Sequence, residues 1–395
     1  MKRFKIKYRP EIDSLRAISV IAVIIYHAKI NLFGYKLFPG GYLGVDVFFV
    51  ISGYLITSII LKELHENKNF SFINFYFRRA RRILPALVFL LLCTLPIAWF
   101  VLLPSTFVDF SKSIYFSLGF SSNFFFYFTG LEYGGVDGLL KPLLHTWSLA
   151  VEEQYYILFP ILLVLSFFFL KKRINIIILL LLLLSLIFAE FFSSKNSNLN
   201  FYILPSRAWE LLVGAALVIL ESKRKFRSSD LMSNIFCLIG LGLIFLSFTY
   251  FYESVPSPGI KNTVPIIGTL LILIFINNKT LIARILNNNL FTGIGLISYS
   301  LYLWHYPIFS FARNLRIAQG IVEYSLIGIL IFLISIISYF FIEKPFRDKK
   351  FISNKVFIKF FIISLSFLIL SSFIIIKNKG FKNSFQNYDS FSTDY

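Results

Sequence analysis

The stretch IDSLRAISVIAVIIYHAKI, residues 12–30, is long and apolar enough to cross a bilayer as a helix, yet it holds Arg16 and His27. Eleven helical steps give about 16 Å of rise and about three turns, so both side chains project from nearly one face. An ionisable group inside a membrane helix costs about 2.5–3.5 kcal/mol and usually faces a cavity or a partner. We expect a cationic anchor near the start of this helix and a proton-handling imidazole near its end. A topology-setting arginine with an interfacial histidine is the other open interpretation.

The composition is that of a membrane protein with many spans. Of 395 residues, 57% are hydrophobic and only 15% are charged. The formal charge of +19 is spread over short segments between apolar runs, which is typical of topology signals and not of nucleic-acid binding. Cys93 and Cys237 both fall inside apolar runs, and no Cys/His spacing resembles a metal site. We expect neither a metal nor a nucleic-acid partner.

The apolar runs predict an all-α bundle of about ten or eleven transmembrane helices. The basic N-terminus lacks a cleavage site after the first run, which indicates a retained signal-anchor with a cytoplasmic N-terminus. Most of the 39 Lys and Arg residues then lie in segments placed inside. The predicted spans are residues 12–31, 45–62, 84–104, 150–170, 174–191, 204–220, 231–251, 263–276, 290–312, 321–342 and 355–376.

The domain organisation is predicted from the same runs. Residues 1–350 are expected to form one transmembrane domain, residues 351–377 an additional transmembrane helix, and residues 378–395 a short, disordered external tail. Residues 105–149 are rich in aromatic residues but broken by glycines and a proline. They are external, re-entrant, or an even number of short spans, and these three paths stay open.

The second span contains GVDVFFVISGYLIT, residues 44–57. Ser52 and Gly53 place a hydroxyl beside bare backbone, which allows another helix to approach closely. Asp46 lies about 9 Å before Ser52 along the helix axis, on the outer side. Packing by Ser52 and Gly53, and solvation or capping by Asp46, are the alternatives to a functional role.

A basic cluster, RRARR, precedes the third span. Arginine forms bidentate contacts with phosphate, so four arginines together suit the phosphates of a cytosolic coenzyme. A role limited to fixing topology is the alternative. The cluster comprises Arg78, Arg79, Arg81 and Arg82.

The stretch HTWSLAVEEQYY, residues 145–156, combines several groups that carry chemistry. Two adjacent carboxylates that enter a bilayer face are costly unless they line an aqueous cavity. Elsewhere, spacings of three residues predict ion pairs of Asp13 with Arg16 and of Arg207 with Glu210. In the ninth span an interfacial aromatic belt is expected to contain Tyr299, Tyr302, Trp304 and His305.

Taken together, these motifs resemble the bacterial acyltransferase-3 family, the integral membrane O-acetylases of lipopolysaccharide, peptidoglycan and other glycans. The resemblance covers roughly residues 8–347, with the motifs in the family's order. The motifs are IDSLRAISVIAVIIYHA, GVDVFFVISGYLI, RRARRILPA, LLHTWSLAVEEQYYILFP, RAWELLVG, and ISYSLYLWHYPI with IEKPFR.

The resemblance implies an enzyme of the bacterial cytoplasmic membrane that moves an acyl group, acetyl in the first instance, from cytosolic acetyl-CoA to a glycan hydroxyl beyond the membrane. O-antigen, peptidoglycan and exopolysaccharide are the candidate acceptors. The implied catalytic residues are His27, Arg16 and Glu152. The implied coenzyme-binding residues are Arg78, Arg79, Arg81, Arg82, Ser52, Gly53 and Tyr54. Weaker sugar-binding candidates are Asp46, His145, Trp147, Ser148 and Glu153.

In the implied mechanism the pantetheine arm of the coenzyme enters between the first two spans. His27 either deprotonates the acceptor hydroxyl or carries the acyl group briefly. Arg16 supports the thioester end or orients the coenzyme, and Glu152 polarises His27 or binds the sugar.

The chain departs from many relatives, which follow an eleventh span with an external SGNH-hydrolase-like domain. Only a short polar tail follows that span here. Either a separate SGNH-type protein outside the membrane finishes the transfer, or this chain acylates its acceptor directly, or the gene is shortened. A transporter or flippase of an anionic lipid or sugar, with the same buried charges on an ion pathway, is the alternative function.

Overall fold

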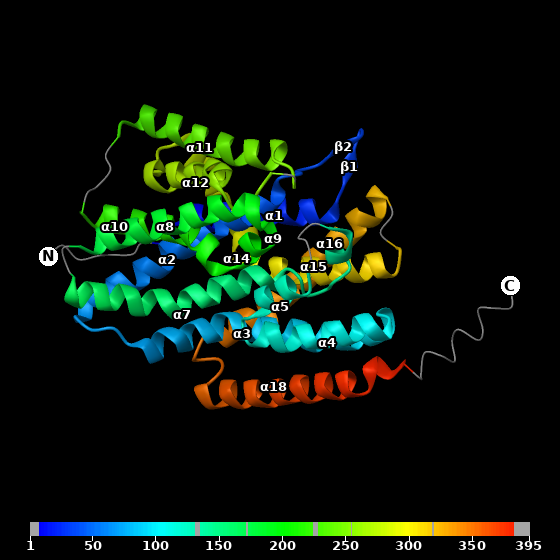
Figure 1. Cartoon of the computed structure of the whole chain (residues 1–395). Coiled ribbons are helices and arrows are strands. Elements are labelled where there is room, and N and C mark those ends of the chain that lie inside the picture. The colour runs from blue at the N-terminus through cyan, green and yellow to red at the C-terminus, as the bar shows by residue number, and fades with distance from the viewer. Residues whose placement is uncertain are drawn as a thin grey trace. The chain divides into compact units, whose positions relative to one another are not determined.

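The computed structural model describes residues 8–130, 135–170, 173–223, 228–253, 255–317 and 320–382. Within these ranges the regular structure is almost entirely helical (Figure 1). The exception is one antiparallel pair of short strands, β1 (Asn31–Leu32) and β2 (Tyr35–Lys36). Parts of the basic N-terminus and most of the predicted external tail lie outside the described residues.

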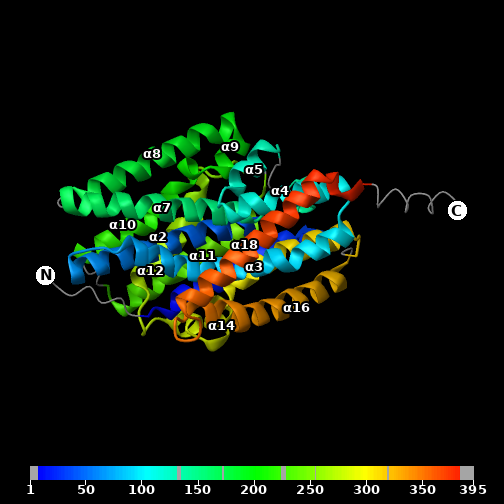
Figure 2. The ribbon, with the colours of Figure 1, turned by 90° about the horizontal axis from the view of Figure 1, so that it is seen from below.

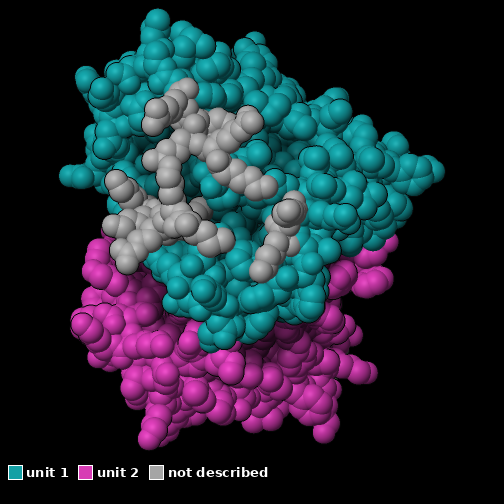
Figure 3. All heavy atoms as spheres, turned by 90° about the vertical axis from the view of Figure 1, so that its left-hand side faces the viewer, with its two compact units in different colours: residues 1–72, 151–299 teal, residues 73–150, 300–395 magenta. Residues whose placement is uncertain are grey.

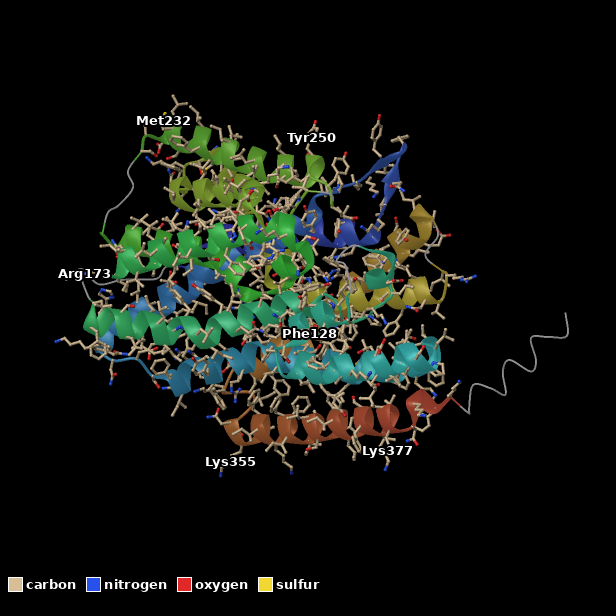
Figure 4. All side chains as sticks on the ribbon, in the orientation of Figure 1. Phe128, Arg173, Met232, Tyr250, Lys355 and Lys377 are labelled. Atoms are coloured by element: carbon tan, nitrogen blue, oxygen red, sulfur yellow. The ribbon has the colours of Figure 1, made fainter. Side chains whose placement is uncertain are left out.

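Seven helices in the described part are long and apolar enough to cross a membrane. The chain is therefore an all-α polytopic membrane protein, as its sequence predicts. These helices are α2 (Gly44–Asn67), α3 (Phe72–Val101), α7 (Thr146–Phe169), α8 (Ile174–Lys195), α11 (Asp230–Tyr250), α16 (Ile321–Ser338) and α18 (Asn354–Lys377). Lys355 and Lys377 mark the two ends of α18, as expected for a span with polar borders (Figure 4).

Four other predicted spans are helical but shorter or more charged. The helices α1 (Pro10–Ala28) and α10 (Leu204–Lys223) each carry several ionised side chains. The helix α12 (Thr263–Phe275) has 13 residues and α15 (Ser298–Asn314) has 17, fewer than the roughly 20 that span a bilayer. Shorter helices in the second half of the chain include α9 (Ser197–Tyr202), α13 (Leu281–Leu286), α14 (Asn289–Leu296) and α17 (Lys344–Arg347).

The predicted ninth span, residues 290–312, is not one helix. It breaks at Ile297, which ends α14 before α15 begins. At Gly295 a Cβ would collide with the backbone carbonyl of Asp13, so α14 lies directly on the backbone of α1. The local sequence does not reveal this close approach, because it depends on a residue far away in the chain.

The start of the third predicted span and the path of residues 105–149 also go beyond what the sequence showed. The third span was predicted to begin at residue 84, but α3 begins at Phe72, so the RRARR arginines lie on a helix. Residues 105–149 contain α4 (Pro104–Leu118), α5 (Ser122–Phe128) and α6 (Val136–Leu139), with 15, 7 and 4 residues. Each is too short for a full span.

The chain divides into two compact units, which Figure 3 shows in different colours. Unit 1 contains residues 1–72 and 151–299, and unit 2 contains residues 73–150 and 300–395. In unit 1, α10 packs against α2 and α8, α11 packs against α12, and α1 packs against α2 and α14. In unit 2, α18 packs along α4, and the Tyr115 hydroxyl donates to the carbonyl of Ile369 over 3.0 Å (Figures 1 and 2).

Glycine decides how closely α2 and α10 approach each other. A Cβ at Gly53 would collide with the carbonyl oxygen of Leu211, and one at Gly214 would collide with that of Val50. The two glycines therefore let the backbones meet directly, the small-residue packing typical of membrane helices. The close helix approach predicted for Gly53 is observed, and it leaves no need for a coenzyme to explain this glycine.

We expect Gly53→Ala to lower the free energy of unfolding by about 1–3 kcal/mol, because the added methyl group forces α2 and α10 apart. Chemical unfolding of the detergent-solubilised protein measures this loss. Gly242→Ala is the matched control, since a Cβ at Gly242 on α11 meets nothing within 4 Å. Equal stability of the two variants would contradict the packing role of Gly53.

Candidate active site

Helix α1 presents Arg16 and His27 as the sequence predicts. Arg16 Nη1 lies 3.3 Å from Asp13 Oδ1, which confirms the predicted pair. The second carboxylate oxygen of Asp13 accepts a 2.8 Å hydrogen bond from the Tyr8 hydroxyl. Arg16 is half-buried, whereas His27 is only 1% exposed. The imidazole therefore sits inside protein and not at a lipid-facing or solvated surface.

Aromatic rings surround the outer end of α1. The Tyr26 ring meets the His27 ring edge-on, with centroids 4.9 Å apart, and lies 5.4 Å from the ring of Tyr42. Lys29 ends the helix in the left-handed conformation, with φ of 54°. Its ammonium lies 4.3 Å from the centroid of the Tyr26 ring. This packing fixes the position of the imidazole.

A polar contact joins α2 and α7 in unit 1. The hydroxyls of Ser52 and Tyr156 both donate to Oε1 of Glu152. Ser52 and Glu152, predicted separately from two motifs, are thus in direct contact although 100 residues separate them. Tyr156 was missed, and its spacing of four residues from Glu152 was the available signal. Glu153, the neighbouring carboxylate, is 9% exposed.

The coenzyme-binding role predicted for Tyr54 is not supported by its surroundings. Its hydroxyl accepts a 2.6 Å hydrogen bond from Arg9 Nη1 and donates over 2.9 Å to Glu221. Arg9 also contacts Glu11 at 2.6 Å and the carbonyl of Leu273 at 2.7 Å. Tyr54 therefore ties the start of α1 to α2, α10 and α12, and its polar atom is already used.

Asp46 was a weak candidate for sugar binding, and the structure places it inside a buried cluster. Asp46 is 1% exposed and lies 3.1 Å from Arg207 Nη1, while Asn262 donates to its other oxygen at 2.5 Å. Arg207 also pairs with Glu210 at 3.0 Å, which confirms the predicted pair. Both oxygens of Asp46 are occupied within a buried cluster that crosslinks α2, α10 and the start of α12.

The arginines of the RRARR motif are not equivalent. Arg81 is 2% exposed, and its Nη1 donates to the carbonyl of Phe346 over 2.7 Å. Its Nη2 donates to the carbonyl of Ile352 at 2.7 Å and to the Asn354 side chain at 3.0 Å. Arg81 therefore anchors the turn before α18, a role that its prediction as a coenzyme-facing residue did not include. Of the other three, one is exposed and two are half-buried, namely Arg78, Arg79 and Arg82.

A second buried cluster forms within unit 2. The Ser148 and Tyr302 hydroxyls lie 2.5 Å apart, and Tyr302 donates to the carbonyl of His145 over 3.1 Å. The His145 and His305 rings meet edge-on with centroids 5.7 Å apart. Both histidines are 0% exposed, and Trp304 is 4% exposed. Trp304 and His305, expected in an interfacial aromatic belt, therefore pack inward, whereas Tyr299 and Tyr302 are half-buried.

The predicted site residues divide between the units. Unit 1 holds Arg16, His27, Asp46, Ser52, Gly53, Tyr54, Glu152 and Glu153. Unit 2 holds Arg78, Arg79, Arg81, Arg82, His145, Trp147 and Ser148. Trp147 is 1% exposed and Ser148 is 4% exposed, so neither offers an open surface to a sugar. Among the described residues no cluster of His, Cys, Asp and Glu is placed to hold a metal ion.

Comparison with known proteins shows the family to which the chain belongs. The model of a family described as an acyltransferase domain matches residues 9–340. The chain belongs to this acyltransferase family. The match contains every predicted site residue, and α18 lies beyond it.

Three relatives illustrate the similarity of this family member to known proteins. The peptidoglycan O-acetyltransferase OatA of Listeria monocytogenes is 33% identical over 365 residues, covering 89% of this chain and 58% of that protein. The putative peptidoglycan O-acetyltransferase YrhL of Bacillus subtilis is 32% identical, with 89% and 57% covered. The O-acetyltransferase OatA of Staphylococcus aureus is 32% identical, with 89% and 59% covered.

The chain thus spans less than two thirds of the length of these relatives, 57% to 59%. No solved structure matches it significantly.

Proposed function

We propose that this protein is a membrane O-acyltransferase that moves an acetyl group from cytosolic acetyl-CoA to a hydroxyl of a glycan outside the membrane. Membership of the acyltransferase family and the relatives named for O-acetyl transfer support the reaction class. Peptidoglycan is the first acceptor to test, because two of those relatives are named for it. The bacterial cytoplasmic membrane is the site of action in this proposal.

One observation carries the proposal, namely the burial of His27. An imidazole that is 1% exposed, at the end of a helix with Arg16 nearer its start, is shielded from solvent and held by aromatic neighbours. Histidine is the side chain that most often acts as a general base, so an imidazole held in such a site is suited to take the proton of a hydroxyl. Exclusion of water from such a site also favours transfer over hydrolysis of the thioester.

The reaction balances without any further reactant. His27 takes the hydroxyl proton of the acceptor, and the resulting oxygen attacks the thioester carbonyl. A carbon–oxygen bond forms, the carbon–sulfur bond breaks, and the proton passes to the leaving thiolate. The products are the O-acetyl glycan and CoA thiol. In this account Arg16 stabilises the negative charge that develops at the thioester.

Glu152 acts indirectly in this proposal. Its Oε1 is already engaged by Ser52 and Tyr156, so we assign it to positioning α2 against α7.

The direct test is release of CoA thiol by the purified protein, measured with and without glycan fragments. We expect thiol release that depends on the acceptor, together with an equal amount of glycan ester. A transporter or flippase would release no thiol under either condition, so this result would overturn the proposal.

The coenzyme's phosphates are assigned to the arginines of α3 that are not buried. We expect the double variant Arg78→Ala with Arg82→Ala to weaken acetyl-CoA binding roughly tenfold or more and to reduce its dependence on salt, because charged hydrogen bonds to phosphate are lost. Isothermal titration of acetyl-CoA measures both. Arg173→Ala is the control, an exposed arginine at the start of α8 (Figure 4). Unchanged affinity in the double variant would remove these residues from the site.

A further inference from the structure

A cavity of about 290 Å³ lies in unit 1 at the end of α1 where His27 sits. The end of α1 and the chain after it form one side, and the residues after α11 form the other. Figure 1 shows where α1, β2 and α11 lie. We call it the α1–α11 pocket. Its principal lining residues are Tyr26, Lys29, Lys36, Phe38, Tyr252 and Glu253. The topology predicted from the Lys and Arg residues places both connections on the outer side of the membrane.

The frame of the pocket is built into the fold. The Gly40 amide donates to the carbonyl of Phe248 over 2.9 Å, and a Cβ at Gly40 would collide with the carbonyl of Ser247. The Phe38 ring packs 6.2 Å from that of Phe248. The Tyr42 hydroxyl donates over 3.3 Å to the carbonyl of Tyr252. These contacts fasten the connection after α1 directly to α11, so the pocket is preformed.

The lining combines aromatic faces with a few charged groups. Tyr26, Phe38 and Tyr252 supply rings on which the C–H face of a sugar can lie. Lys29 pairs with Glu253, whose carboxylate can also accept from sugar hydroxyls. Lys36 adds a second ammonium, so the pocket has two cations and one anion. An aromatic pocket with net positive charge suits a sugar that carries a carboxylate.

The pocket is adjacent to the proposed base. Tyr26 lines the pocket on one side, and its ring contacts the His27 ring with centroids 4.9 Å apart. Because Tyr26 precedes His27 on α1, a sugar bound against Tyr26 lies one side chain away from the imidazole. The pocket therefore places an acceptor next to the proposed base, with only the Tyr26 ring between them.

We propose that the α1–α11 pocket binds the acceptor glycan and that Lys36 makes it prefer glycan fragments that carry a carboxylate, on the sugar or on an attached peptide. The inference rests on the proposed function, because only acetyl transfer makes the bound glycan an acceptor. Its test measures glycan binding alone and needs no acetyl transfer. Tyr252 provides the stacking face, and Lys36 provides the charge selection.

The charge selection is tested by isothermal titration of soluble, muramidase-released peptidoglycan fragments, without acyl donor. The matched probe is the same preparation with its carboxylates methyl-esterified. We expect wild type to bind the untreated fragments more tightly, and Lys36→Gln to reduce this preference about threefold to fivefold, the magnitude of one exposed charge contact. Lys261→Gln is the control, an exposed lysine after α11 that does not line the pocket.

The stacking face is tested with a second pair of variants. We expect Tyr252→Ala to weaken binding of both fragment preparations about fivefold, because an aromatic contact is lost while the backbone carbonyl that Tyr42 uses remains. Tyr250→Ala is the control, since Tyr250 is an exposed tyrosine at the end of α11 and does not line the pocket (Figure 4).

The outcomes separate the pocket from the proposed reaction. Unaltered binding in both Lys36→Gln and Tyr252→Ala would overturn the pocket assignment, even if acetyl transfer is observed. Equal wild-type affinity for the two preparations would overturn the charge selection. Fragment binding with the expected losses, but no thiol release from acetyl-CoA, would retain the pocket and overturn the proposed function.

Discussion

His27→Gln will lower the rate of acetyl transfer about 10²- to 10⁴-fold, because glutamine keeps a polar side chain but cannot take the hydroxyl proton. Initial rates of glycan ester formation measure the loss. His65→Gln is the control, because His65 lies near the C-terminal end of α2. It is half-buried, and its ring nitrogen lies 2.6 Å from the carbonyl oxygen of Leu61. Transfer by His27→Gln at the wild-type rate would contradict the assignment of the base.

Covalent labelling of wild type and His27→Ala distinguishes the two chemical roles of His27. A base forms no covalent intermediate, so wild type incubated with labelled acetyl-CoA should carry no label after denaturation. If wild type is labelled and His27→Ala is not, His27 is an acyl carrier and the direct route is wrong.

Arg207→Met will lower the free energy of unfolding by about 3–5 kcal/mol, because it leaves two buried carboxylates without their cation. Asp46 and Glu210 lie 3.1 Å and 3.0 Å from the guanidinium and are 1% and 0% exposed. Unfolding in detergent measures the loss. The exposed Arg284→Met is the control, with an expected change within about 0.5 kcal/mol.

A triple variant shows whether Arg207→Met loses stability through unpaired charges or through lost packing. Arg207→Met combined with Asp46→Asn and Glu210→Gln removes the unpaired charges, so it should be more stable than Arg207→Met alone. Equal stability of the single and triple variants would show that the cluster acts by packing.

The helices follow from the sequence because their cause is local. A run of apolar residues such as the one in α18 satisfies its backbone within itself, so it predicts a helix wherever the chain places it. The pairs of Asp13 with Arg16 and of Arg207 with Glu210 follow for the same reason, since helical spacing alone brings them together.

The roles of Tyr54 and Arg81 did not follow, because their partners are distant in the chain. Tyr54 meets Arg9, which is 45 positions away, and Arg81 meets Phe346, which is 265 positions away. The sequence pattern shows that each residue is unusual in an apolar setting, but tertiary contacts decide whether its polar atoms face a ligand or the backbone.

The sequence predicted individual residues of the candidate site, but not which of them contact one another. Ser52 and Glu152 were each selected from a motif, and only the fold shows that they touch. No motif pointed to Asn262, because it lies in the connection between α11 and α12 and reaches Asp46 across 216 positions. The α1–α11 pocket was not predicted either, because its two sides are short connections without a motif.

The central claim is that an acetyl group passes from the cytosolic side of the membrane to a glycan on the other side. Proteoliposomes with glycan fragments enclosed and labelled acetyl-CoA outside test it most directly. The account predicts labelled ester on the enclosed glycan with wild type and none above background with His27→Gln. Label that reaches the glycan only when both substrates are on the same side of the bilayer would contradict it.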